Sequence, residues 1–198
     1  MNTSNIFDWN KGDICLMNYH LISDDSFFLL GIREVIENLS SNCFVHNVNN
    51  ENRLFYPMAG DVVIITVNDL KLRSLLLRNP KLKRCRLLVM MDIPVLPVRL
   101  SYFPWLIPKN ISTEALLKII NKAVRSMIYR KKVDQKTINI FDELCTGKST
   151  TNLAMTMEDD LKYIYKIKRD IFREYGLLKC NSLGLLLCRD ILCKKPSY

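Results

Sequence analysis

The sequence predicts an α/β domain over residues 1–129, followed by an all-α domain of four helices over residues 130–198. In the first part, short runs of β-branched and apolar residues alternate with helical patterns, which is typical of a parallel sheet with helices on both faces. From Val133 onward only helical spacing remains, and Gly147 and Gly176 interrupt it. About 125 residues is also an ordinary size for one domain.

The expected elements of the first domain follow from these runs. Strands are predicted at residues 14–22, 43–47, 61–67, 86–91 and 104–107, and helices at 26–39, 69–77 and 113–130. Pro94, Pro97 and Pro104 crowd the segment before the last strand. Because proline lacks an N–H group and clashes inside a helix, no ordinary helix is expected there.

The second domain is predicted to hold helices near 133–146, 150–157, 161–175 and 181–194. Asp134 can cap the first helix, and Gly147 stands where a glycine commonly ends one. Ser149 or Thr150 can cap the second helix. An acidic turn over residues 158–160 suits the positive N-terminus of the third helix.

The third helix has an apolar inner face, with Ile164, Ile171 and either Ile167 or Lys168, and an outer face of cations and aromatics. Such a surface suits contact with phosphates and base edges, although a charged helix face is more often simply solvated. Two helices joined by a tight turn, the second one basic, are typical of proteins that read the DNA major groove. The candidate DNA-binding residues are Lys162, Tyr163, Tyr165, Lys166, Arg169, Arg173, Lys148 and Thr150.

Over about fifty residues this part resembles the four-helix DNA-binding domain of LuxR/FixJ-type (NarL-like) bacterial regulators. The matching positions are Ile140, Phe141, Glu143, Leu144, Gly147, Ser149, Leu153, Ala154, Met157, Ile164, Ile171 and Tyr175. Thr137, Asn152 and Ile167 replace polar residues of the family's pattern. The resemblance implies a LuxR-type helix-turn-helix fold, with DNA contacts from Lys162, Tyr165, Lys166 and Arg169.

The layout of the first domain is similar to the receiver (flavodoxin-like) domain of two-component response regulators. The run from Asp61 to Ile65 resembles the family's Asp-Val-Val-Leu-Leu, but Thr66 then stands at the phospho-accepting position. Ser23 and Asp24 fall on the family's acidic metal-binding pair, and Lys109 falls on its lysine. The resemblance implies a degenerate receiver pocket of Asp24, Thr66 and Lys109, similar to that of accessory enterobacterial regulators.

Aspartyl phosphorylation needs a carboxylate nucleophile and a Mg²⁺ ion held by acidic oxygens. Thr66 cannot form an acyl phosphate, so activation by phosphorylation is not expected. Asp24 and Asp25 could bind a metal weakly, but capping the helix that starts at Ser26 is the favoured interpretation.

Composition narrows the class of protein further. The net charge is +9 and spread over both parts, which favours a nucleic-acid partner without locating it. Seven cysteines without paired metal-ligand spacing indicate reduced thiols, so a cytoplasmic protein without metal or cofactor is expected. No signal peptide or membrane-spanning run is apparent, and no catalytic constellation predicts an enzyme.

Two functional hypotheses remain. The first is a DNA-binding transcriptional regulator, a homodimer or a heterodimer with a related regulator, that controls bacterial surface-structure (such as fimbrial) or stress genes. The second is an interaction protein that titrates or retargets another regulator and binds little DNA itself. The leucine-rich last helix, residues 183–192, suits either association or closure of the domain's own core.

Overall fold

A parallel sheet forms the centre of the first domain in the structure, a computed structural model that describes residues 17–37, 42–49, 56–96, 102–179 and 181–193. Its five strands run in the order β2-β1-β3-β4-β5 and all pair in parallel. This is the strand order of flavodoxin-like doubly wound folds, so the expected receiver-like α/β architecture is confirmed. The strands are β1 (Tyr19–Ser23), β2 (Cys43–Asn47), β3 (Val62–Thr66), β4 (Arg86–Met91) and β5 (Trp105–Pro108).

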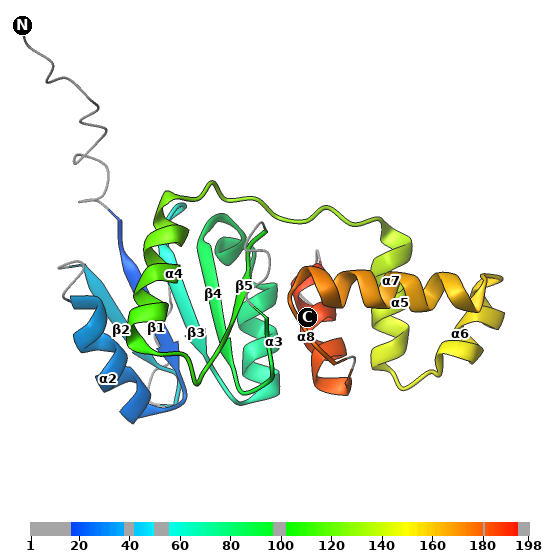
Figure 1. Ribbon diagram of the computed structural model, residues 1–198, viewed down its shortest axis with the longest axis horizontal. Helices are drawn as coiled ribbons and strands as arrows, with labels where there is room; N and C mark the ends of the chain where they lie inside the picture. The colour runs from blue at the N-terminus through cyan, green and yellow to red at the C-terminus, as the bar shows by residue number, and fades with distance from the viewer. Residues whose placement is uncertain (1–16, 38–41, 50–55, 97–101, 180, 194–198) are drawn as a thin grey trace, which may run out of the picture.

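One face of the sheet is covered by α2 (Ser26–Glu37) and α4 (Thr113–Arg125), as Figure 1 shows. Leu29 and Ile36 of α2 and Ile120 of α4 pack there against alternate strand residues. The helix predicted over 113–130 ends earlier, because Ser126 caps it and its backbone N–H bonds to the carbonyl of Ala123. The expected residues 14–16 and 38–39 of the first strand and helix lie outside the described part of the chain.

The opposite face carries α3 (Leu70–Arg78) and the short 3₁₀ helix η1 (Pro80–Arg84). The sequence patterns did not predict η1, which begins at a proline and is capped by Asn79. Between β4 and β5, residues 92–96 and 102–104 form no helix, as the prolines there predicted. Part of this sheet face is therefore left for other elements to cover.

The second domain consists of α5 (Gln135–Cys145), α6 (Thr150–Met157), α7 (Leu161–Glu174) and α8 (Ser182–Leu192). The side chains of Asp134, Ser149, Asp160 and Asn181 cap these helices in turn. Gly147 ends the first helix region with a φ of 94°, a backbone conformation that glycine adopts without strain. The four helices predicted for this domain are confirmed.

The second domain packs through α8 against α3, and the two domains share one core (Figure 1). One continuous core joins Val63 and Val89 of the strands to Phe172 of α7 and Leu187 of α8. A backbone bridge between Val95 and Leu177 also links the two domains. The segment after β4 and the side of the sheet that bears α3 are therefore both in contact with the second domain.

The connection between the domains is held in place by its own side chains. Arg130 donates hydrogen bonds to the carbonyl oxygens of Leu82, Lys83 and Cys85, and Lys131 forms an ion pair with Glu174. A basic run such as residues 129–132 could have contacted phosphates. These two cations instead bind within the chain.

Helix α8 lies between α5 and α3, so its apolar stripe serves both its own domain and the contact with the first. Leu187 and Leu192 are buried, and Leu186 borders a groove between α3 and α8. Of the two interpretations left open for this helix, closure of the core applies to Leu187, because that side chain is fully buried.

Candidate nucleic-acid interface

Helix α7 presents the predicted basic face to solvent because its opposite face is anchored in the core. Ile164 packs with Ile140 of α5 and Leu153 of α6, and Ile171 packs into the core shared with the sheet. These contacts hold both ends of the helix. Its outer residues therefore stand on a rigid element, as a DNA-reading surface requires.

A shallow hollow on this helix is lined by Lys162, Tyr165, Lys166, Lys168 and Arg169. Four of these residues were predicted from the sequence, and the structure brings them together. Lys168 was missed because helical spacing left either Ile167 or Lys168 for the inner face. The hollow thus combines four cations with one exposed aromatic ring, and Tyr165 is 52% exposed.

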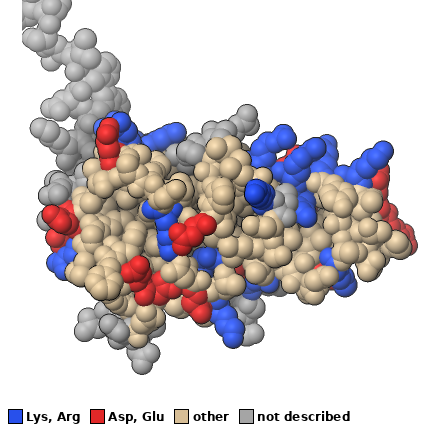
Figure 2. Space-filling view, turned by 60° about the horizontal axis from the view of Figure 1, so that its bottom comes forward, with Lys and Arg blue, Asp and Glu red and all other residues tan. Residues whose placement is uncertain are grey.

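Few acidic groups neutralise this surface. The Asp170 carboxylate lies 4.0 Å from Nε of Arg169, a distance at which an exposed ion pair is weak. In Figure 2, lysine and arginine side chains gather along one edge of the helical part of the molecule. The hollow is therefore suited to bind an anionic surface such as a phosphate backbone.

The other predicted DNA-binding residues do not line the hollow. Tyr163 is 38% exposed, and the ammonium group of Lys136 sits 5.0 Å from the centre of its ring. Arg173 is exposed on the last turn of α7, and Thr150 is partly buried as the first residue of α6. Lys148 is exposed but forms an ion pair with Glu143 at 2.5 Å.

The candidate receiver pocket lies at the carboxyl edge of the sheet, where β1, β3 and β5 end. Asp24 accepts hydrogen bonds from the backbone N–H groups of Asn68 and Asp69, at 2.7 and 3.1 Å. Asp25, not Asp24, caps α2 by accepting from the N–H groups of Phe27 and Phe28. The Asp24 side chain therefore links the end of β1 to the loop that follows β3.

Thr66 is buried at the end of β3, and its hydroxyl has no hydrogen-bond partner among the described residues. The ammonium group of Lys109 donates a hydrogen bond to the Asn68 side-chain oxygen at 2.6 Å and forms an ion pair with the Asp92 carboxylate at 3.1 Å. Asp24 and Lys109 thus have partners in the loops around Thr66. Within the described residues, no group of three or more His, Cys, Asp or Glu side chains could hold a metal ion.

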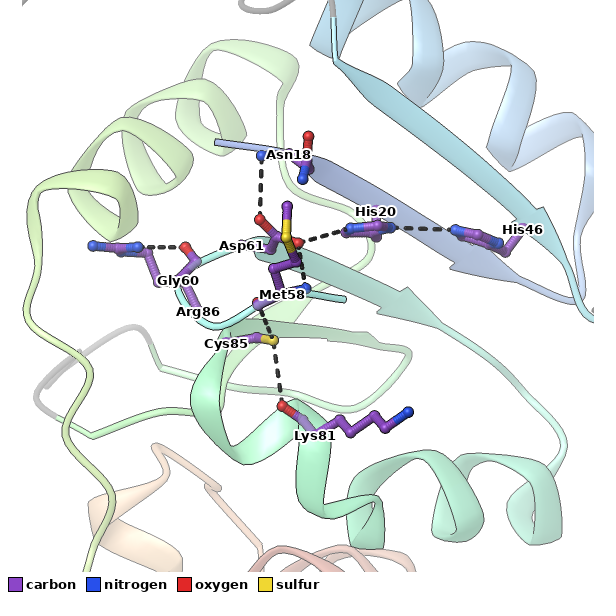
Figure 3. A network of polar contacts seen from close by, with 9 residues as sticks. All are labelled: Asn18, His20, His46, Met58, Gly60, Asp61, Lys81, Cys85 and Arg86. Carbon is purple, nitrogen blue, oxygen red and sulfur yellow. Dashed lines mark hydrogen bonds and ion pairs between the residues drawn. The ribbon is translucent and has the colours of Figure 1, made fainter. Parts of the chain in front are cut away.

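A separate polar network lies at the amino edge of the same sheet (Figure 3). The Asp61 carboxylate accepts from the N–H groups of Asn18 and Met58 and contacts His20 Nε2 at 3.1 Å. His20 Nδ1 lies 3.3 Å from His46 Nε2. Burial lowers the pKa of His20, and the Asp61 carboxylate partly opposes this. His20 is buried in β1, so these contacts link neighbouring strands inside the sheet.

None of the described helices is both long and apolar enough to cross a membrane. No protein-family model matches the sequence, and no curated protein matches it either.

Several solved structures of response regulators have a distantly similar arrangement. RcsB of Salmonella enterica serovar Typhimurium, bound to promoter P1flhDC, is 16% identical with a TM-score of 0.45, over 89% of this chain and 99% of that one. Full-length FixJ from B. japonicum is 11% identical with a TM-score of 0.38, over 88% and 97% of the two chains. ChrA, from a haem-sensing two-component system, is 13% identical with a TM-score of 0.37, over 87% and 95%. Likenesses this distant assign neither a family nor a function to the chain.

Proposed function

We propose that this protein is a transcriptional regulator that binds double-stranded DNA through α7. The observation that carries the proposal is the hollow on α7, where Lys162, Lys166, Lys168 and Arg169 surround Tyr165 on a helix anchored at both ends. Cations there would contact phosphates, and the aromatic ring and the guanidinium would contact base edges. The short turn at residues 158–160 joins α6 to this helix, as in a helix-turn-helix.

We also propose that aspartyl phosphorylation does not control the protein. Thr66 supplies a hydroxyl at the end of β3, where a phospho-accepting carboxylate would be needed. The Asp24 carboxylate accepts two backbone N–H bonds, which favours its present role over holding Mg²⁺. Control would then depend on the amount of the protein or on a partner. Incubation with labelled acetyl phosphate should leave no acid-labile, hydroxylamine-sensitive label, and a label near residue 66 would refute the proposal.

The resemblance to LuxR/FixJ-type regulators extends the proposal to a dimer on DNA, formed with a second copy or with a related regulator. It also suggests bacterial surface-structure or stress genes as targets. Footprinting of the full chain on promoters from its own genome would identify them.

The DNA-binding proposal is tested with the full chain, because the two domains share one core. Lys166→Ala/Arg169→Ala should weaken binding to promoter DNA and lower the slope of log affinity against log salt by about one for each phosphate that is no longer neutralised. The melting temperature should stay nearly unchanged, because neither side chain is part of the core. Lys118→Ala on α4 is a matched control, since Lys118 is an exposed cation on the far side of the sheet.

Unchanged affinity and unchanged salt dependence in the double variant would exclude α7 as the DNA-reading helix. The alternative hypothesis, an interaction protein that retargets another regulator, would then replace this one.

A further inference from the structure

A groove between α3 and α8 combines positive charge with exposed leucines. Lys71, Arg73, Arg78 and Arg189 line it together with one acid, Asp190, so the groove carries a net positive charge. Its apolar lining comes from Leu70, Leu75 and Leu186, and Leu75 is 63% exposed. Exposed apolar residues ringed by charge are typical of an interaction surface.

Arg73 differs from the other arginines of this groove in having no direct contact with a carboxylate. The residue is 7% exposed, and no hydrogen bond or ion pair of its guanidinium occurs within the described residues, although Asp190, Asp24 and Asp69 act on its charge from a greater distance. Arg78 and Arg189, by contrast, both bind the Asp190 carboxylate, at 2.8 and 2.9 Å. A carboxylate from outside the chain could form a charge-assisted hydrogen bond with Arg73, a contact that no described residue gives it.

A complementary surface lies on α2. Phe27, Leu30 and Glu34, which we call the α2 stripe, are spaced three and four residues apart on one face of the helix. Phe27 is 87% exposed and Leu30 is 67% exposed, which is unusual for two large apolar side chains on one helix face. The carboxylate of Glu34 is exposed, whereas its neighbour Arg33 pairs with Glu37.

The two surfaces cannot meet within one chain. Helix α2 packs on one face of the sheet and α3 packs on the other, as the two separate core clusters show. A contact between the α2 stripe and the groove must therefore join two molecules, and it must join different surfaces of each. Such a head-to-tail contact does not close into a symmetric pair by itself.

We propose that the α2 stripe of a second copy of this chain binds in the α3–α8 groove. Phe27 and Leu30 of one copy contact Leu70, Leu75 and Leu186 of the next, and the Glu34 carboxylate binds the Arg73 guanidinium. The stripe spans ~10 Å along its helix, and the groove extends at least the ~8 Å between Leu70 and Leu75. Because each contact surface is small, the association is expected to be weak and concentration-dependent.

The head-to-tail geometry makes a specific test possible with the full-length protein in sedimentation velocity. The parent protein should form a concentration-dependent series of oligomers without DNA. Phe27→Ser removes the largest apolar side chain of the α2 stripe, and Leu75→Ser removes the most exposed leucine of the groove. Each variant alone should therefore remain a monomer. An equimolar mixture of the two should form a 1:1 complex, because one intact stripe and one intact groove remain.

Met155→Ser provides the matched control, since Met155 is 71% exposed on α6, away from both surfaces, and this variant should associate as the parent does. All three replaced side chains are exposed, so the variants should fold, which circular dichroism checks. A parent that stays monomeric at every concentration would overturn the proposal. So would a mixture that forms no complex, or a dimer that persists in the Leu75→Ser variant, because the latter indicates a symmetric contact elsewhere.

Discussion

Replacing Asp190 by asparagine tests whether the contact between the domains stabilises the whole fold. The Asp190 carboxylate lies on α8, is 5% exposed, and accepts from Nε and Nη2 of Arg78 on α3 at 3.1 and 2.8 Å. Arg189 binds the same oxygen at 2.9 Å. The substitution keeps the shape of the side chain but removes the negative charge that Arg78 and Arg189 share.

Breaking a buried ion pair by removing one partner costs about 3–5 kcal/mol. The two arginines are 13% and 23% exposed, so water can solvate them in part, and we expect a loss near the lower limit, about 3 kcal/mol. Urea unfolding should be followed by tryptophan fluorescence, to which Trp105 in β5 contributes, and by circular dichroism, which is dominated by helices. Both signals should move to lower urea together, because the domains share one core.

The control is Glu37→Gln, which removes an exposed pair between Glu37 and Arg33 on α2 and should change stability little. A loss below about 1 kcal/mol in Asp190→Asn would show that the domain contact contributes little to stability. A shift of the helical signal without the fluorescence signal would refute the idea of a single cooperative unit.

Three further predictions concern other parts of the fold. Ile164→Ala should lower the free energy of unfolding by about 2–5 kcal/mol in urea titrations, because Ile164 is fully buried beneath the proposed DNA-binding face. Gly176→Ala should lower the free energy of unfolding by at least about 1 kcal/mol, since Gly176 has a φ of 71° and a Cβ there would lie 2.1 Å from the Leu96 carbonyl oxygen. Hydrogen exchange should show loss of protection at the backbone amides of Leu96 and Leu177, whose hydrogen bonds lie on either side of this position. Burial lowers the pKa of His20, so on acidification the unfolded chain takes up a proton at this residue before the folded chain does. The contribution of neutral His20 to the free energy of unfolding should therefore be fully present above the ordinary pKa of 6.5 and decrease as the pH drops below it. Denaturant titrations across that range should show a flatter profile for His20→Gln, and an unchanged profile would exclude His20 as the cause.

The local structure of this chain follows closely from its residues. The caps at Asp134 and Ser149 were recognisable because a short polar side chain precedes each apolar periodic run. The strands were recognisable because β3 and β4 are almost uniformly apolar, as strands covered on both faces must be. The differences lie mainly at the ends of elements, such as that of α4 at Arg125.

Contacts between distant segments could not be predicted in the same way. Nothing in the periodicity of α8 distinguishes a leucine that faces its own domain from one that faces α3 or a second molecule. The contact of His20 with Asp61 joins residues 41 positions apart, and parallel pairing of β1 with β3 brings them together only once the register is set. The side of α7 on which Lys168 lies could not be predicted, because a residue at the border between the buried and the exposed face of a helix is placed by tertiary packing.

The open sheet face between α3 and β5 has a consequence for the synthesis of the chain. The last strand ends at Pro108, but the side chains that complete its core come from residues as late as Leu192. A ribosome adding about 5–20 residues per second needs ~4–17 s to make those 84 further residues (192 − 108 = 84). During that interval Val63, Val89 and Leu106 have no cover from α7 or α8. The nascent first domain therefore exposes a hydrophobic surface that chaperones can bind, and a message truncated before α8 yields a product prone to aggregation.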